Sequence, residues 1–143
     1  MNNNLKVALI TGGGTGIGRS SALALQKIGF KVIICGRREG PLKETALLAD
    51  PKNSKITVRI TDISEGRSVE ELFKKISIEF GRLDVMFNNA GMGAPRVPFD
   101  ILKENDWRRC VDVNLTGTFL CAQAAFKLMK EQKPQGGRII NNG

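Results

Sequence analysis

A glycine-rich turn near the start of the chain has the residue types and spacing to bind a phosphate group. Thr11 to Gly18 reads Thr-Gly-Gly-Gly-Thr-Gly-Ile-Gly, directly after the apolar run Val7 to Ile10 and before a helical pattern. Glycines let the backbone pass close to a ligand, and the first N–H groups of the next helix point at an anion above them. A glycine run alone could be an ordinary loop, but its place between a strand and a helix favours a phosphate cradle.

Alternating strand and helix patterns surround this turn. Short apolar runs predict five strands, at Lys6–Thr11, Lys31–Cys35, Ile56–Ile60, Leu83–Phe87 and Arg138–Asn141. The third run alternates apolar and polar residues, which indicates a strand near the edge of a sheet. Short connections between strands and helices favour parallel pairing. We therefore expect an α/β fold with a doubly wound parallel sheet, in a single domain over residues 1–143.

Four helical patterns lie between the predicted strands. The first ends near Gly29, the second has Pro41 at its first position, and the third carries an apolar stripe from Val69 to Phe80. The last is a long helix from Lys103 to about Glu131, with no charged residue between Val113 and Phe126. A helix that is apolar on every side must be covered on both faces. We expect one face to pack on the sheet and the other to meet a second subunit, which predicts a homo-oligomer.

The composition excludes several function classes. Apolar residues make up 41% of the chain and no apolar segment approaches the ~20 residues of a membrane span, so we expect a cytoplasmic protein with no membrane partner. The chain has no histidine, which excludes Ser-His-Asp and Cys-His catalysis and histidine metal sites. Cys35, Cys110 and Cys121 lack the spacing of a disulfide framework or a zinc site. We expect no metal, and cysteines that act as small buried apolar residues.

The net charge of +8 raises the question of a polyanionic partner. One alternative is a basic nucleic-acid-binding α/β module, which would bind DNA with a steep salt dependence. However, the basic residues are spread along the chain in pairs such as Lys74-Lys75 and Arg108-Arg109, with little aromatic interleaving. A solvated basic surface, or attraction toward a phosphorylated small molecule, accounts for the same charge. We therefore expect no nucleic-acid partner.

Several motifs, in this order, resemble the short-chain dehydrogenase/reductase family over the whole chain. They are the Thr11-x-x-x-x-Gly16-Ile-Gly18 turn, Asp62 after the third strand, Asn88-Asn89-Ala90-Gly91 after the fourth, Asn114 in the long helix, and Gly137-Arg-Ile-Ile140 at the fifth strand. The resemblance implies a Rossmann-type fold of three layers, in which helices cover both faces of one sheet. It also implies NAD(P)-dependent hydride transfer on a small-molecule carbonyl, hydroxyl or activated alkene, including enoyl or oxoacyl compounds.

The resemblance further implies roles for individual residues. Those expected to contact the cofactor are Gly12, Thr15, Gly16, Ile17, Gly18, Arg37, Arg38, Asp62, Ile63, Asn89, Ala90 and Gly91. The glycine turn would wrap the pyrophosphate, Asp62 would contact the adenine, and Asn89 to Gly91 would lie along the ribose. Asp62 or Ser64 could instead cap the next helix. Asn114 would hold a water in a proton relay to a catalytic lysine, or would be a buried, locally satisfied polar residue.

The end of the second strand distinguishes the two nicotinamide cofactors. NAD sites have an acid there that binds the ribose 2′-hydroxyl, whereas NADP sites have a cation for the 2′-phosphate. This chain has Gly36 in place of the acid, followed by Arg37 and Arg38, and a guanidinium is a bidentate phosphate donor. An exposed basic turn is the alternative. We predict NADP(H) in preference to NAD(H), with Arg37 as the main contact.

The family's catalytic serine and its Y-x-x-x-K helix follow the fifth strand, and this sequence stops at Gly143 without any tyrosine. The residues present therefore supply no general acid or base for the family's reaction. We expect an amino-terminal part of a longer enzyme, with a fold incomplete at its C-terminus, inactive and marginally stable by itself. The alternative is a complete short protein that binds nucleotide without catalysis.

Overall fold

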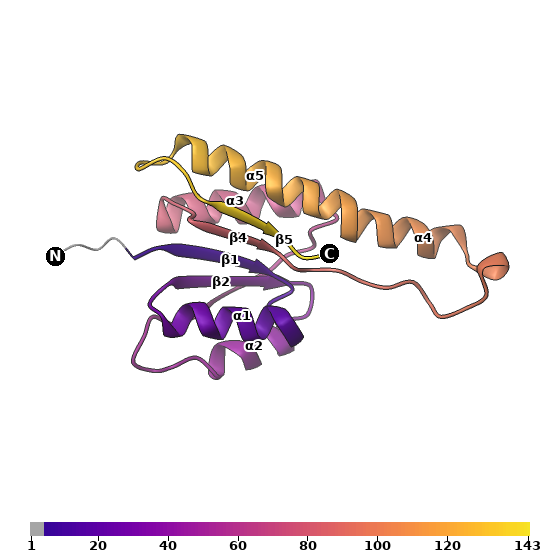
Figure 1. Cartoon of the computed structure of the whole chain (residues 1–143), viewed down its shortest axis with the longest axis horizontal. Coiled ribbons are helices and arrows are strands. Elements are labelled where there is room, and N and C mark those ends of the chain that lie inside the picture. The colour runs from indigo at the N-terminus through magenta and orange to yellow at the C-terminus, as the bar shows by residue number, and fades with distance from the viewer. Residues whose placement is uncertain (1–4) are drawn as a thin grey trace.

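The computed structural model describes residues 5–143, which form one sheet covered by helices on both faces (Figure 1). The strands in this part of the chain are β1 (Val7–Thr11), β2 (Lys31–Gly36), β3 (Thr57–Ile60), β4 (Val85–Asn88) and β5 (Arg138–Asn141). All neighbouring strands are parallel, in the order β3-β2-β1-β4-β5. The chain runs outward from β1 to β3 and then returns to β4 on the other side. The carboxyl ends of β1 and β4 therefore form a topological switch point.

Two helical layers enclose the sheet (Figure 1). Helices α1 (Gly16–Lys27) and α2 (Glu39–Leu47) cover one face, and α3 (Gly66–Phe80) and α5 (Thr118–Glu131) cover the other. A 3₁₀ turn, η1 (Phe99–Ile101), precedes α4 (Glu104–Val111), and the π-helical segment η2 (Asp112–Gly117) joins α4 to α5. Among residues 5–143, no helix combines the length and the apolar character that crossing a membrane requires. The arrangement is the predicted three-layer α/β fold.

The core follows from the alternation of side chains along the central strands. Val7 and Leu9 of β1 pack into a cluster with α3 and α5, whereas Ala8 and Ile10 pack into a cluster with α1 and α2. All four side chains are at most 1% exposed. Because helices cover both faces, all of β1 and the four inner residues of β2 are buried, which is why these strands appear as continuous apolar runs.

Most predicted elements are confirmed, including the edge position of β3, and two details are wrong. Helix α2 begins at Glu39, so Pro41 is its third residue and not its first. Proline is tolerated there because the N–H groups of a helix's first turn have no partner within the helix. The long helix spans Glu104 to Glu131, close to the prediction, but six of its residues form a π-helical segment that the sequence pattern does not indicate.

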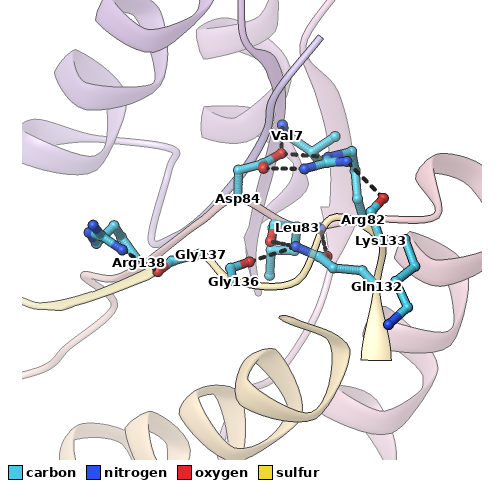
Figure 2. A network of polar contacts seen from close by, with 9 residues as sticks. All are labelled: Val7, Arg82, Leu83, Asp84, Gln132, Lys133, Gly136, Gly137 and Arg138. Atoms are coloured by element: carbon cyan, nitrogen blue, oxygen red, sulfur yellow. Dashed lines mark hydrogen bonds and ion pairs between the residues drawn. The ribbon is translucent and has the colours of Figure 1, made fainter. Parts of the chain in front are cut away.

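A polar network ties together the amino-terminal ends of the strands, at the edge opposite the switch point (Figure 2). The Asp84 carboxylate accepts hydrogen bonds from the Val7 backbone N–H at 2.8 Å and from the Arg82 guanidinium at 2.7 and 3.0 Å. The Gln132 side chain, in a residue only 5% exposed, bonds both backbone groups of Leu83, at 2.7 and 2.9 Å. These contacts fix the start of β1 and β4 without any part in the site described below.

Asp84→Asn is expected to lower stability in a pH-dependent way. The Arg82 hydrogen bond is the main reason that the pKa of Asp84 lies below its ordinary value. The carboxylate therefore adds stability that is fully present above the unfolded-state pKa near ~4 and is lost as the pH falls through the lower folded-state pKa. We expect the variant to lose about 2 kcal/mol of unfolding free energy at pH 7. Urea denaturation should show this loss shrinking below pH ~4.

Glu104→Gln is the control for this substitution. Glu104 also pairs with an arginine, Arg108, but the two side chains are 72% and 62% exposed. Exposed pairs contribute little, so the expected change is within about 0.5 kcal/mol at any pH. An equal loss for Asp84→Asn at pH 7 and at acid pH would contradict the role assigned to its charge.

Candidate functional site

A cavity of about 600 Å³ opens at the carboxyl ends of the strands. The residues predicted from the sequence that line it are Gly12, Thr15, Gly16, Ile17, Arg37, Arg38, Asp62, Ile63, Asn89, Ala90 and Gly91. The structure adds Gly14, from the glycine turn, and Gly36, which stands in place of the acid of NAD sites. It also adds neighbours in space that no motif singles out: Cys35, Pro41, Leu42, Thr61 and Val113. The volume suits a small-molecule or cofactor site. Its place at the switch point is where ligands bind in sheets of this topology.

The glycine turn forms one wall of the cavity and leads into α1. The Gly12 N–H donates to the Cys35 carbonyl at 2.8 Å, which holds the turn against the end of β2. Thr15 is the N-cap of α1, and the first turn of this helix has no acidic residue. The positive end of the α1 dipole therefore faces the cavity without a competing carboxylate, as an anion site requires.

Gly18 does not line the cavity, but it allows α1 to pack closely against the glycine turn. A Cβ atom at Gly18 would lie 2.1 Å from the Gly12 carbonyl oxygen and 2.6 Å from Nδ2 of Asn89. Only a residue without a side chain allows α1 to start this close to the turn. The predicted role of Gly18 in close helix packing is thus visible in the geometry.

The end of β4 is joined to the end of β1 by Thr11 and Asn89. Thr11 Oγ1 accepts the backbone N–H groups of Asn89 at 3.0 Å and Ala90 at 2.9 Å. In return, the Asn89 side-chain amide donates to the Thr11 carbonyl at 3.1 Å. These bonds hold Ala90 and Gly91 along the cavity beside the glycine turn.

Arg37 and Arg38 form a cationic rim at the end of β2. Both are exposed, and neither forms an ion pair with any other residue between 5 and 143. The carboxylates that follow in the sequence are engaged elsewhere: Glu39 pairs with Lys43 at 2.8 Å and Glu44 with Arg19 at 3.1 Å. The two guanidinium groups are therefore available to an anionic ligand.

Asp62 lies at the cavity and shapes the turn before α3. Its Oδ1 accepts from the Ser64 backbone N–H at 3.0 Å and from Ser64 Oγ at 2.6 Å. The N-cap of α3 is Glu65, without a side-chain cap, so neither Asp62 nor Ser64 caps this helix as the alternative proposed. Asp62 and Ile63 both face the cavity, and their contact with a cofactor stays a prediction.

Asn114 does not line the cavity and instead holds the loop that follows Gly91. Its Oδ1 accepts the Met92 N–H at 2.8 Å and its Nδ2 donates to the Met92 carbonyl at 2.7 Å. The residue is exposed, so it is locally satisfied but not buried as that alternative proposed. It lies in the π-helical segment η2, and π turns often occur at functional sites. Its role in a proton relay stays a prediction.

The buried cysteines are poor nucleophiles. Burial, with a smaller contribution from Cys121, raises the pKa of Cys35 far above its ordinary value. Burial alone raises the pKa of Cys121 to about 12. Both side chains remain protonated thiols near neutral pH, and the thiol is not the reactive form. Cys35 lines the cavity as an apolar wall.

Comparison with known proteins identifies the family. The family model described as short chain dehydrogenase matches residues 6–143. A 3-oxoacyl-(acyl-carrier-protein) reductase from Synechocystis sp. is 36% identical over 137 residues, which is 95% of this chain and 54% of the relative. A 3beta-hydroxysteroid dehydrogenase from Mediterraneibacter gnavus is 34% identical, over 95% of this chain and 48% of the relative. The chain spans about half the length of the curated relatives it matches.

Solved structures share the same fold. A metagenomic short-chain oxidoreductase in complex with NADP superposes with a TM-score of 0.88 at 27% identity, over 95% of this chain and 61% of the other. An NAD⁺-bound xylitol dehydrogenase gives the same TM-score, 0.88, at 27% identity, over 95% of this chain and 52% of the other. Because the family model covers nearly the whole described chain and these structures share its sheet and helices, the chain belongs to the short-chain dehydrogenase family of oxidoreductases.

Proposed function

We propose that this chain binds NADP(H), and that the protein transfers hydride between the nicotinamide and a carbonyl or hydroxyl substrate. The observation that carries the proposal is the shape of the cavity, which has anion-binding groups at two places. The N-terminus of α1 and the glycine turn are at one, and Arg37 and Arg38 are at the other. A dinucleotide with a pyrophosphate and a separate 2′-phosphate has charges at two matching places.

The lining residues fit the parts of such a cofactor. Gly12, Gly16 and Ile17 would surround the pyrophosphate, because a backbone without bulky side chains allows the closest approach. Asp62 and Ile63 form the wall where the adenine would lie. Asn89 to Gly91 would follow the ribose on the nicotinamide side, and Asn89 and Ala90 are fixed there by their bonds to Thr11. When bound, the nicotinamide supplies or accepts the hydride. The chain's own residues hold and orient the cofactor.

The relatives' names give different substrates, an oxoacyl compound for one and a hydroxysteroid for another. We include oxoacyl compounds as carbonyl substrates in the proposal, and enoyl compounds as activated alkenes. The residues in hand contain no tyrosine. They therefore supply the cofactor-binding half of the chemistry, without the tyrosine acid/base that the family uses. We expect no NADPH-dependent carbonyl reduction by the 143-residue protein alone.

Fluorescence titration with NADPH and NADH tests the cofactor assignment. The expected result is a Kd for NADPH at least about tenfold lower than for NADH, because one charge-assisted phosphate contact contributes roughly 1.5 kcal/mol or more. The difference should shrink as salt is added, since the contact is partly exposed. Equal affinity for the two cofactors would overturn the assignment to NADP(H).

We also propose that the protein forms a homo-oligomer through the long helix. Leu115, Phe119 and Phe126 are 67%, 57% and 64% exposed, and their spacing places them on one stripe of the helix. Such a contiguous apolar stripe is typical of an interface. Sedimentation velocity at micromolar concentration should detect a dimer or larger species, and a strict monomer would contradict the proposal.

A further inference from the structure

Thr45, near the C-terminal end of α2, uses its side chain to connect two parts of the chain that lie far apart in the sequence. The residue is 0% exposed. Its hydroxyl lies 2.9 Å from the carbonyl oxygen of Gly13 in the glycine turn and 3.1 Å from that of Pro41 in the first turn of α2. Because one hydroxyl has one proton, it donates to one of these oxygens at a time. Either way, the group lies between the glycine turn and α2.

Arg19 completes this contact from the first turns of α1. Its Nε donates to Thr45 Oγ1 at 2.9 Å, and its terminal nitrogen donates to the Pro41 carbonyl at 3.3 Å. The Arg19 side chain is 27% exposed, so the guanidinium is largely covered by these partners. Arg19 does not line the cavity, and its charge is paired with Glu44 at 3.1 Å. It therefore acts on the position of α2 and not on a ligand.

The glycine turn and α2 also meet without spare room. A Cβ atom at Gly14 would lie 3.0 Å from Cβ of Pro41 and 3.3 Å from the backbone nitrogen of Leu42, both in α2. Arg38 is the N-cap of α2, so the Arg37–Arg38 turn moves with that helix. Any shift of α2 relative to the glycine turn thus changes the distance between the two anion-binding places of the cavity.

From these contacts we propose that Thr45, oriented by Arg19, is a positioning residue for recognition of the cofactor's 2′-phosphate. This inference rests on the proposed NADP(H) function. The covalent structure of NADPH fixes the separation of its pyrophosphate and its 2′-phosphate, so both are bound well only if the glycine turn and the arginine turn stay correctly spaced. NADH has no 2′-phosphate, so of the two anion-binding places it uses only the glycine turn. A change in spacing therefore weakens NADPH binding more than NADH binding.

The test compares Kd values for NADPH and NADH in Thr45→Val and Thr45→Ser. Valine keeps the shape of threonine and removes the hydroxyl, whereas serine keeps the hydroxyl. The NADPH preference is the Kd for NADH divided by the Kd for NADPH. We expect Thr45→Val to lower this ratio by about tenfold, which corresponds to the loss of one hydrogen-bonded contact. We expect Thr45→Ser to keep a ratio close to that of the parent protein. The stoichiometry of each titration corrects for any unfolded fraction.

Gln26→Leu is the matched control. Gln26 is 1% exposed, and its amide bonds the backbone of Asp50 at 2.9 and 3.1 Å and the Ser54 carbonyl at 3.0 Å, in the loop that follows α2 and away from the glycine turn. This variant should lose thermal stability while it keeps the NADPH preference. An unchanged preference in Thr45→Val, or equal falls in Thr45→Val and Gln26→Leu, would overturn the inference. A parent protein that itself shows no preference for NADPH would instead contradict the proposed function.

Discussion

Gly18→Ala is expected to weaken NADPH binding by at least about a hundredfold. It should also destabilise the fold by about 3 kcal/mol, the upper part of the range for overpacking. The added Cβ atom would lie 2.1 Å from the Gly12 carbonyl oxygen and 2.8 Å from the Gly12 carbonyl carbon. Both are backbone atoms of the glycine turn, so no side-chain rotation can relieve the clash. Either α1 or the turn must move, and the turn also carries the anion-binding N–H groups.

The same contact explains why binding and stability should fall together. Asn89 Nδ2, which donates to the Thr11 carbonyl at 3.1 Å, would lie 2.6 Å from the new Cβ. A displaced Asn89 would loosen the junction of β1 and β4. Urea denaturation measures the loss of stability, and fluorescence titration should show at least about a hundredfold weaker NADPH binding, which corresponds to ~2.7 kcal/mol.

Gly66→Ala is the control for this substitution. Gly66 is the first residue of α3, and a Cβ atom there would have no atom within 4 Å. The expected change in stability is within about 1 kcal/mol, and it favours the variant if the helix gains from alanine. If Gly18→Ala had as little effect as Gly66→Ala, the claim that α1 lies too close to the glycine turn to accept a side chain at Gly18 would be contradicted.

The sequence predicts the sheet and most of the residues around the cavity because both depend on local patterns. Buried parallel strands require unbroken apolar runs, so Val7 to Ile10 and Val32 to Cys35 are visible without a structure. The turn after each strand is likewise a short local motif. Once the strands are parallel, their carboxyl ends must lie at one edge, and this brings Gly16, Arg37 and Asn89 to one cavity.

The remaining features depend on contacts between residues that are distant in the sequence. A threonine within a helix, such as Thr45, can have many roles, and nothing local indicates that its hydroxyl reaches Gly13. The link from Gln132 to Leu83 likewise becomes apparent only when the chain is folded. The π-helical segment around Asn114 has weak helix formers such as Thr116 and Gly117, the only local hint of an irregular turn.

Gly36→Asp is expected to reverse the cofactor preference. Gly36 lines the cavity at the end of β2, directly before Arg37. A Cβ atom there would make ordinary contacts with the Leu42 side chain at 3.7 and 3.8 Å, so the substitution requires no movement of the backbone. The carboxylate would accept a hydrogen bond from the ribose 2′-hydroxyl of NADH. In the NADPH complex, the same carboxylate would repel the 2′-phosphate and partly neutralise Arg37. The loss of affinity should be large, because like charges in contact cost several kcal/mol.

The expected Kd for NADPH rises by about a hundredfold at low salt, while that for NADH stays the same or falls several-fold. Gly36→Asn separates the charge from the added volume, because asparagine has nearly the shape of aspartate without its charge. We expect Gly36→Asn to keep the preference for NADPH with only a few-fold loss of affinity. Equal losses in the two variants would mean that the side-chain volume and not the charge disturbs the site. That result would contradict the contact between Arg37 and the 2′-phosphate, because a negative charge placed beside Arg37 would then have no effect of its own on NADPH binding.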